Sequence, residues 1–129
     1  MQSAGQQDAL TMTTLVAIER FNEAFNRHDV DALMAVMAED CVFENTFPPP
    51  DGERHEGHAA VRSVWELFFG ASPRATFEFE ETFACGERCV VRWLYRWVET
   101  DGMNGHVRGV DVFRMRDGKI VEKLSYAKG

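Results

Sequence analysis

Asp111 is the residue whose type and position most directly suggest chemistry in this sequence. It lies in a stretch of alternating apolar and polar residues that ends at Asp117-Gly118, a pair typical of a two-residue hairpin turn. Alternation places Asp111 on the same strand face as Phe113 and Met115, so its carboxyl group is expected among apolar neighbours. Such a group is costly unless it is paired, hydrogen-bonded or protonated, which makes Asp111 a candidate functional acid. Two structural alternatives stay open: a solvated sheet face, or a carboxylate neutralised by a neighbouring Arg.

Large aromatic side chains accompany Asp111 as candidates for the same site. Trp93, Tyr95 and Trp97 share one face of an expected strand, where aromatic residues usually belong to the core. Together with Trp65 they exceed what a tight contact between sheet and helices needs, so they are candidates for the wall of a ligand cavity. The Tyr95 hydroxyl is a candidate to orient a carbonyl group or to bond Asp111.

His55 and His58 are three residues apart, a spacing that can suggest a pair of metal ligands. The segment is typical of a loop before a helix, and no third ligand has a compelling position. We therefore predict no metal site and no cofactor. His55 is instead a candidate for a pH-sensitive group at the mouth of a cavity.

Composition limits the classes of function. The chain has 129 residues, 45% of them hydrophobic, which fits one domain with a real core. Its net charge of −7 opposes nonspecific binding to nucleic acid or anionic membranes. Residues 1–12 are expected to be a disordered tail rather than a secretory signal, and residues 13–129 a single domain. Three cysteines without such a signal predict free thiols and a cytoplasmic location.

Helical spacing dominates the first half of the chain, and strand alternation dominates the second half. A first helix is expected over about 13–27, a second after the N-cap candidate Asp29, and a third after Gly57. The later segments read as long antiparallel hairpins, in which one parity carries Phe77, Phe79 and Phe83. This order predicts an α+β fold with the helices packed on one face of a curved sheet.

The opposite sheet face mixes aliphatic and arginine side chains, a combination that suits a protein interface. A homodimer through this face is the favoured interpretation, and the alternative is that long Arg stems simply cover the sheet. The residues that define this outer face are Arg92, Leu94, Arg96, Val98, Val110 and Val112.

Several segments resemble those of the nuclear transport factor 2-like superfamily, and they span about 13–126. The similar segments are the helix corner over 21–33, its continuation over 37–45, the helix start over 57–62 and the last hairpin over 110–122. Within the superfamily the chain most resembles the SnoaL-like polyketide cyclases, which are related to ketosteroid isomerases. The resemblance implies a cone-shaped cavity between a strongly bent, mixed or antiparallel sheet and three helices on its concave face. This scaffold hosts isomerases, cyclases, hydrolases, dehydratases and non-catalytic binders.

The resemblance also implies roles for individual residues. Asp111 falls where ketosteroid isomerases place a protonated acid that donates to the developing enolate. Asn45 occupies the position at which those isomerases have the Asp that transfers the proton. The amide of Asn45 cannot abstract a proton and can only donate or accept hydrogen bonds. Phe21 and Trp65 replace an oxyanion-hole Tyr and a supporting Tyr. The cavity is therefore expected to be more apolar, and the ketosteroid isomerase reaction itself is not expected.

Two classes of function follow. In the first, the protein is a cofactor-independent isomerase- or cyclase-type enzyme on a small apolar carbonyl compound, with Asp111 as acid and base and with Asn45 and Tyr95 on the carbonyl oxygen. In the second, the same cavity binds an apolar molecule without changing it, or the domain mainly dimerises. The residues expected to contact the ligand are Phe21, His55, Trp65, Phe79, Trp93, Trp97 and Phe113.

Overall fold

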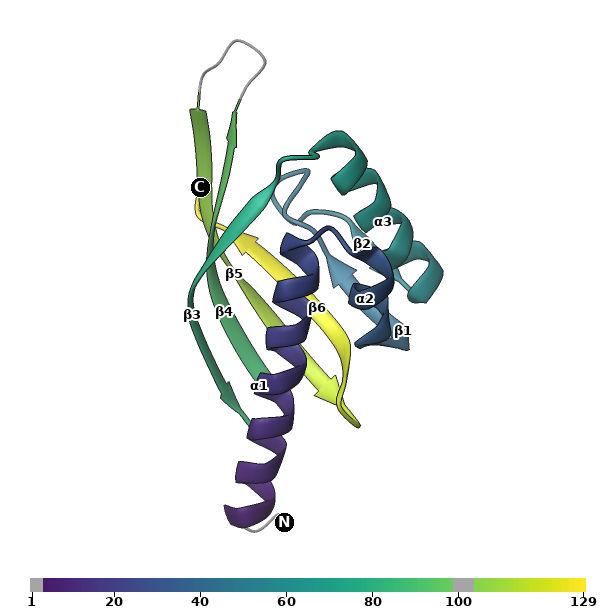
Figure 1. The fold of residues 1–129 in the computed structure, drawn as a ribbon, viewed down its shortest axis with the longest axis vertical. Helices are drawn as coiled ribbons and strands as arrows, with labels where there is room; N and C mark the ends of the chain where they lie inside the picture. The colour runs from purple at the N-terminus through teal and green to yellow at the C-terminus, as the bar shows by residue number, and fades with distance from the viewer. Residues whose placement is uncertain (1–3, 99–103) are drawn as a thin grey trace.

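A computed structural model describes residues 4–98 and 104–129, which form helices packed on one side of a bent sheet (Figure 1). The described helices are α1 (Ala4–Asn26), α2 (Val30–Ala35) and α3 (His58–Ala71). The described strands are β1 (Met37–Glu44), β2 (Arg54–Glu56), β3 (Thr76–Cys85), β4 (Arg88–Val98), β5 (Asn104–Arg116) and β6 (Lys119–Ala127). The strand order is β2-β1-β6-β5-β4-β3, with β1 and β6 parallel and the other neighbours antiparallel. The predicted α+β class with a mixed sheet is confirmed.

The first helix is longer than the sequence pattern indicates. It begins at Ala4, so residues 4–12, expected to be a disordered tail, continue α1 in the structure. Polar contacts hold this part of the helix on the turn between β3 and β4. Thr11 Oγ1 accepts a hydrogen bond from the amide of Gly86, and Thr14 Oγ1 donates one to the carbonyl of the same residue at 2.7 Å. The apolar periodicity used to place the helix start does not report such contacts.

The predicted N-cap of α2 is confirmed. The Asp29 carboxylate accepts a hydrogen bond from the amide of Ala32 at 3.0 Å, which satisfies one of the free amides at the start of that helix. Leu33 and Met34 of this short helix are buried. Met37, which continues the helical spacing of Leu33 and Met34, is instead the first residue of β1.

Asn26 joins the end of α1 to the start of β3. Its amide donates to the carbonyl of Phe77 and accepts from the amide of the same residue, both at 2.9 Å. This pair of bonds imitates strand pairing, so we expect Asn26→Ala to lower the free energy of unfolding by about 1–2 kcal/mol. Urea denaturation measures the loss. Asn26→Asp keeps the acceptor but loses the donor, so this variant should also be less stable than the wild type. Wild-type stability in either variant would show that Asn26 does not stabilise the start of β3.

A β-bulge bends the sheet near the middle of β3. The register with β4 shifts between Phe79 and Glu81, so the residues beyond the shift change face. Phe77 and Phe79 point toward the helices. Phe83, which has the same parity in the sequence, pairs with Val90 and is 56% exposed. Simple alternation therefore assigns Phe83 to the wrong face.

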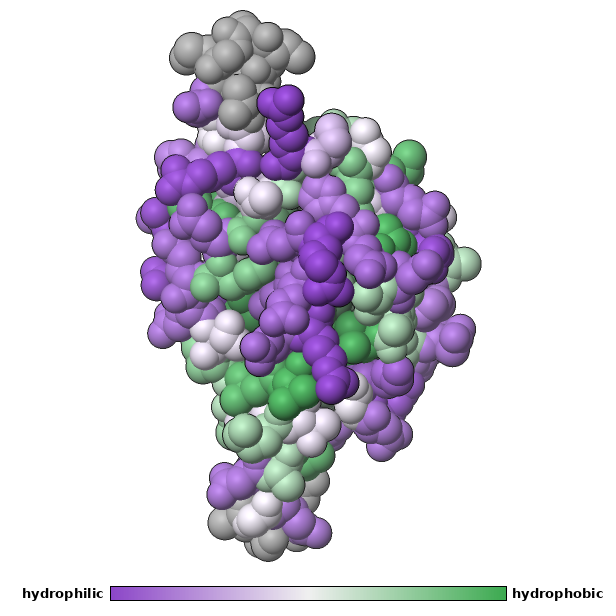
Figure 2. All heavy atoms as spheres, in the orientation of Figure 1, coloured by the Kyte–Doolittle hydropathy of each residue, from purple (hydrophilic) through white to green (hydrophobic). Residues whose placement is uncertain are grey.

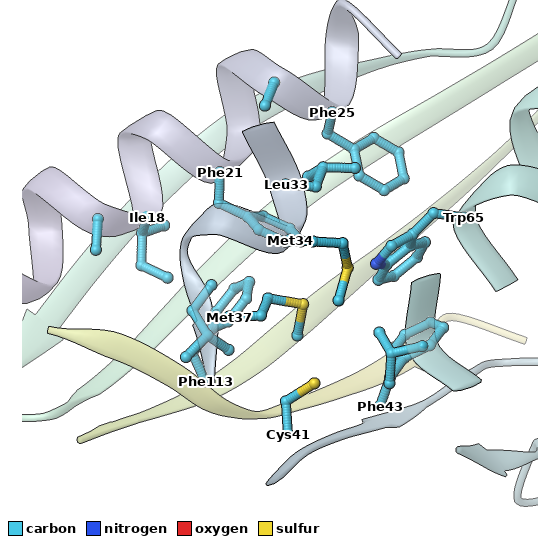
Figure 3. Close-up of a cluster of buried hydrophobic side chains, with 14 of the residues drawn as sticks. Ile18, Phe21, Phe25, Leu33, Met34, Met37, Cys41, Phe43, Trp65 and Phe113 are labelled. Carbon is cyan, nitrogen blue, oxygen red and sulfur yellow. The ribbon is translucent and has the colours of Figure 1, made fainter. Parts of the chain in front are cut away.

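The core lies between the helices and the concave face of the sheet (Figure 3). Phe21 and Phe25 of α1 pack against Trp65 of α3, with ring centroids 6.3 and 5.5 Å apart respectively. Phe21 also meets Phe113 of β5 edge-on at 5.7 Å. These contacts cross-link α1, α3 and the sheet, which fixes the walls of the space that remains between them.

The outer face of the sheet is covered largely by its own charged side chains. Leu94 is only 2% exposed, and its neighbours across the sheet are Glu78 and Arg108. Arg108 pairs with Glu80, and Arg96 pairs with Glu78. This favours the alternative in which Arg stems cover the sheet, and a homodimer stays a prediction. The side chain of Val98 lies outside the part of the chain that the structure describes.

Hydrophilic side chains cover most of the face shown in Figure 2, and apolar ones gather in small patches. None of the helices in the described part of the chain is long and apolar enough to cross a membrane.

Candidate functional site

A cavity of about 220 Å³ lies between α1, α3 and the sheet. Most of its wall is apolar, and its aromatic members are Phe21, Phe25, Phe43, Trp65, Phe68, Phe77, Phe79, Trp93, Tyr95 and Trp97. The polar side chains that line it are Asn22, Asn45, Thr46, Asp111, Lys123 and Ser125. A mostly apolar cavity with a few convergent polar groups is the usual form of a small-molecule site.

Asp111 forms a polar triad with Ser125 and Lys123, in which the two charged side chains are buried. The Ser125 hydroxyl donates to Asp111 Oδ1 at 2.6 Å, and Lys123 Nζ lies 3.4 Å from Asp111 Oδ2. Lys123 Nζ also donates to the Ser125 hydroxyl at 3.0 Å. Asp111 and Lys123 are 6% and 5% exposed, so each compensates the burial of the other's charge. The predicted apolar-facing position of Asp111 is confirmed, but its charged partner is a lysine and not an arginine.

A β-bulge in β6 brings the two partners to Asp111. Regular pairing from the two-residue turn at 117–118 would place Leu124 opposite Asp111. The register instead shifts where β6 carries Val121 as an extra residue, and Asp111 pairs with Ser125. A shift of one residue moves every later side chain to the other sheet face, so Lys123 and Ser125 face the cavity.

Lys123 is surrounded by aromatic faces as well as by Asp111. Its Nζ lies 4.5 Å from the centroid of the Phe43 ring and 5.2 Å from that of Trp65, in cation–π geometry. Burial lowers the pKa of the Lys123 ammonium below its usual range, and the nearby Asp111 carboxylate offsets part of that change. The side chain is therefore closer to releasing its proton than an exposed lysine is.

Two tryptophans on β4 lie over glycines of the neighbouring strand. Trp93 pairs with Gly109 and Trp97 with Gly105. A Cβ at Gly109 would lie 2.4 Å from the Trp93 ring, and one at Gly105 would lie 2.4 Å from the Trp97 ring. The glycines thus let both indoles lie close against β5, which leaves open the space above them.

Asn45 and Tyr95 both line the cavity, but at different places. Asn45 Oδ1 accepts from the amide of Thr46 at 2.8 Å, which holds the side-chain amide in place. Tyr95 lies four residues along β4 from Val91, the partner of Asp111, which corresponds to about 13 Å along the strand. Among the described residues the partners of Asp111 are Ser125 and Lys123, so the expected bond from Tyr95 to Asp111 is not formed.

Two residues expected at the ligand do not line the cavity. Phe113 is fully buried in the core behind it. His55 of β2 pairs with Phe43 of β1, with ring centroids 6.3 Å apart, and its imidazole is 3.6 Å from Glu53. The other expected contacts, Phe21, Trp65, Phe79, Trp93 and Trp97, do line it.

Sequence reasoning missed Lys123 and Ser125, and it also missed Asn22, which is 9% exposed on α1. Asn22 is next to Phe21 in the sequence and three residues before Phe25, both on the buried face of the helix. Its position on that helical face was the available signal.

The thiols take no part in this site. Cys41, Cys85 and Cys89 are free, as predicted, and Cys41 and Cys89 are buried. Burial raises the pKa of the Cys89 thiol to about 11, so that group is a structural thiol rather than a nucleophile.

In residues 4–98 and 104–129 no three His, Cys, Asp or Glu side chains are grouped as metal ligands.

Comparison with known proteins places this architecture in a family. Residues 18–123 match the family model of the SnoaL-like domain. The chain belongs to the SnoaL-like family. No curated protein sequence matches it.

Solved structures of other proteins have a similar fold. A nuclear transport factor 2-like protein of unknown function from Mesorhizobium loti is 43% identical, with a TM-score of 0.80, and the match covers 92% of this chain and 93% of that one. A candidate polyketide cyclase from Xanthomonas campestris is 25% identical, with a TM-score of 0.74 and 91% of each chain covered. A Mycobacterium tuberculosis protein solved in complex with estradiol-17β-hemisuccinate is 26% identical, with a TM-score of 0.74 and coverage of 88% and 92%.

Proposed function

We propose that this SnoaL-like protein binds a small, largely apolar carbonyl compound and moves a proton next to the carbonyl group, without a cofactor. Asp111 accepts and returns the proton. The observation that carries the proposal is the triad of Asp111, Ser125 and Lys123, whose charged members are buried, in a mostly apolar cavity. The reaction is of the isomerase or cyclase type, since both need an enol or enolate to form and collapse.

The triad supports acid–base chemistry in a specific way. A carboxylate has about four acceptor positions, and the bonds to Ser125 and Lys123 leave room for a ligand C–H or O–H. The ammonium of Lys123 places a positive charge where negative charge would develop on the substrate oxygen, in a site shielded from water. Asn45 adds the N–H donors of a held amide to the same cavity.

The cavity size sets the scale of the ligand. A cavity of about 220 Å³ is larger than the roughly 150 Å³ apolar cavity that takes up benzene, and it is smaller than typical drug-sized pockets. One or two fused rings with a carbonyl group therefore fit better than a complete steroid skeleton.

A second candidate function is binding of an apolar molecule without turnover. Both carboxylate oxygens of Asp111 already have protein partners, and the relative from Mycobacterium tuberculosis was solved with a bound steroid derivative. In this case the triad would orient the polar end of the ligand and no proton would move.

Binding is tested first by a thermal-shift screen of aromatic aldehydes and ketones, anthraquinone-like polyketides, steroid enones, terpenoids and short fatty acids. A ligand at about 100 times its Kd should raise the Tm by roughly 10 °C, because only the native state binds it. The expected hits are one- and two-ring carbonyl compounds. If no class raises the Tm, the cavity does not bind small molecules and both candidate functions are wrong.

Proton transfer is then tested on an enolisable ketone hit. We expect wild-type protein in D₂O to exchange the protons next to the carbonyl, as followed by NMR, and Asp111→Asn to slow this exchange by at least about 100-fold. Asp40→Asn, which changes an exposed carboxylate paired with Arg116, is the matched control and should exchange normally. Binding without exchange by the wild type would leave only the non-catalytic candidate.

A further inference from the structure

Lys123 differs from every other lysine of the chain. The sequence has three lysines, and Lys119 and Lys128 are exposed whereas Lys123 is 5% exposed and lines the cavity. A buried amine beside an acid and next to a bound carbonyl compound has a known chemical use: it adds to the carbonyl carbon.

We propose that Lys123 is a nucleophile that condenses with the bound aldehyde or ketone to form an iminium ion. This inference rests on the proposed function for the class of ligand, and it adds a covalent step that acid–base catalysis by Asp111 alone does not need.

The geometry supports both requirements of this step, which are an amine that faces the ligand and a nearby group that carries protons. Lys123 Nζ faces the same cavity as the proposed ligand and lies 3.4 Å from Asp111 Oδ2, so a proton can pass directly between them. Ser125 provides a second route, because its hydroxyl accepts from Nζ and donates to Asp111 Oδ1. The faces of Phe43 and Trp65 hold the amine from the apolar side without taking a proton from it. Burial also lowers the pKa of Lys123, which raises the share of free amine.

The condensation balances when Asp111 accepts and returns each proton. Asp111 takes one proton from the ammonium, and the free amine forms a C–N bond while the carbonyl π electrons move to oxygen. Asp111 returns its proton to that oxygen and then removes a second proton from nitrogen, which gives a neutral carbinolamine. Asp111 finally protonates the hydroxyl group, the C–O bond breaks, water leaves and the nitrogen lone pair forms the iminium double bond. The net change is ammonium plus carbonyl to iminium plus water, with Asp111 again a carboxylate.

The iminium would change what Asp111 has to do. A positively charged nitrogen next to carbon attracts electrons more strongly than a neutral carbonyl oxygen, so the neighbouring C–H becomes easier to ionise. Asp111, again a carboxylate and close to this nitrogen, is the base available to remove that proton.

Reductive trapping tests the inference. The full-length protein is incubated at neutral pH with benzaldehyde and sodium cyanoborohydride, which reduces an iminium to a stable benzylamine. Peptide mass spectrometry then locates the benzyl group among the three lysines and the N-terminal amine. We expect labelling of Lys123 at least about tenfold faster than that of Lys119 or Lys128, since the cavity holds the aldehyde beside the Lys123 amine.

Two controls keep the result tied to the cavity. Toluene has the ring but no carbonyl group, so at saturating concentration it should slow labelling of Lys123 and leave Lys119 and Lys128 unaffected. Lys123→Arg keeps a cation beside Asp111 but cannot form an iminium, so it should lose the fast label. The toluene control needs no variant, so the inference stays testable if Lys123→Arg does not fold.

The outcomes separate the two proposals. Suppose that benzaldehyde raises the Tm but labels only Lys119 and Lys128. This result would overturn the proposal that Lys123 is a nucleophile and leave the acid–base proposal standing. If benzaldehyde neither raises the Tm nor labels Lys123, both proposals are overturned. Fast label on Lys123 that toluene does not slow would place the reactive amine outside the cavity and also overturn the inference.

Discussion

Removing either charge of the Asp111–Lys123 pair is expected to lower the free energy of unfolding by about 3–5 kcal/mol. Both side chains are almost fully buried, so Asp111→Asn leaves a cation, and Lys123→Met leaves an anion, without its counter-charge. Urea denaturation of the two single variants measures the losses. Asp40→Asn breaks an exposed ion pair with Arg116 that solvent screens, so it should change the free energy of unfolding very little.

The double variant Asp111→Asn/Lys123→Met is the sharper test of the pair. With both charges gone, the introduced side-chain amide can still accept from the Ser125 hydroxyl, and the introduced thioether chain can fill the space among Phe43 and Trp65. We therefore expect the double variant to be more stable than either single variant, with a coupling of several kcal/mol. Additive losses would show that the two charges do not compensate each other.

The pH dependence of stability gives a second check on the same pair. Burial places the pKa of Lys123 in the folded protein below its ordinary value of about 10.5. Between these two values the unfolded chain binds more protons than the folded one, so the Lys123 contribution to stability rises with pH and levels off above 10.5. This rise should be absent in Lys123→Met and larger in Asp111→Asn, where no carboxylate offsets the burial of the ammonium. Denaturation at a series of alkaline pH values measures the three curves.

The sequence predicted the position of Asp111 but not its partners, for a reason that lies in the register. Alternation along β5 is regular, so Asp111, Phe113 and Met115 point inward as expected. The bulge at Val121 is not marked by Gly or Pro, the residues that usually signal an irregular strand. If the bulge is not taken into account, alternation places Lys123 on the outer face of the sheet. The buried partner of Asp111 is then predicted to be a surface lysine.

Periodicity also gives the face of a residue but not its depth. Phe113 is on the same strand face as Asp111, but its ring packs against that of Phe21. Phe113 therefore belongs to the core and does not line the cavity. The helices, the long hairpins and the cap at Asp29 were predictable because each depends on local pattern. The extension of α1 depends on hydrogen bonds to Gly86, about 75 residues away in the sequence, which no local pattern contains.

Gly109→Ala is expected to damage both stability and binding, because Gly109 sets the depth at which Trp93 lies. A Cβ at this position would come within 2.3 Å of the Tyr126 carbonyl oxygen and 2.4 Å of the Trp93 ring, so backbone and indole must both shift. Overpacking of this kind costs about 1–3 kcal/mol. Trp93 lines the cavity, and the direction open to its ring is away from β5 and into the ligand space.

Gly70→Ala is the matched control for this substitution. A Cβ at Gly70, near the end of α3, has no neighbour within 4 Å, so the variant should keep full binding and gain up to about 1 kcal/mol from helix propensity. Urea denaturation and thermal shift with a carbonyl hit measure both variants. Normal stability with lost binding in Gly109→Ala would mean that only the indole moves. Normal binding with lost stability would mean that only the contact with Tyr126 matters, and Trp93 would then not be a wall of the functional cavity.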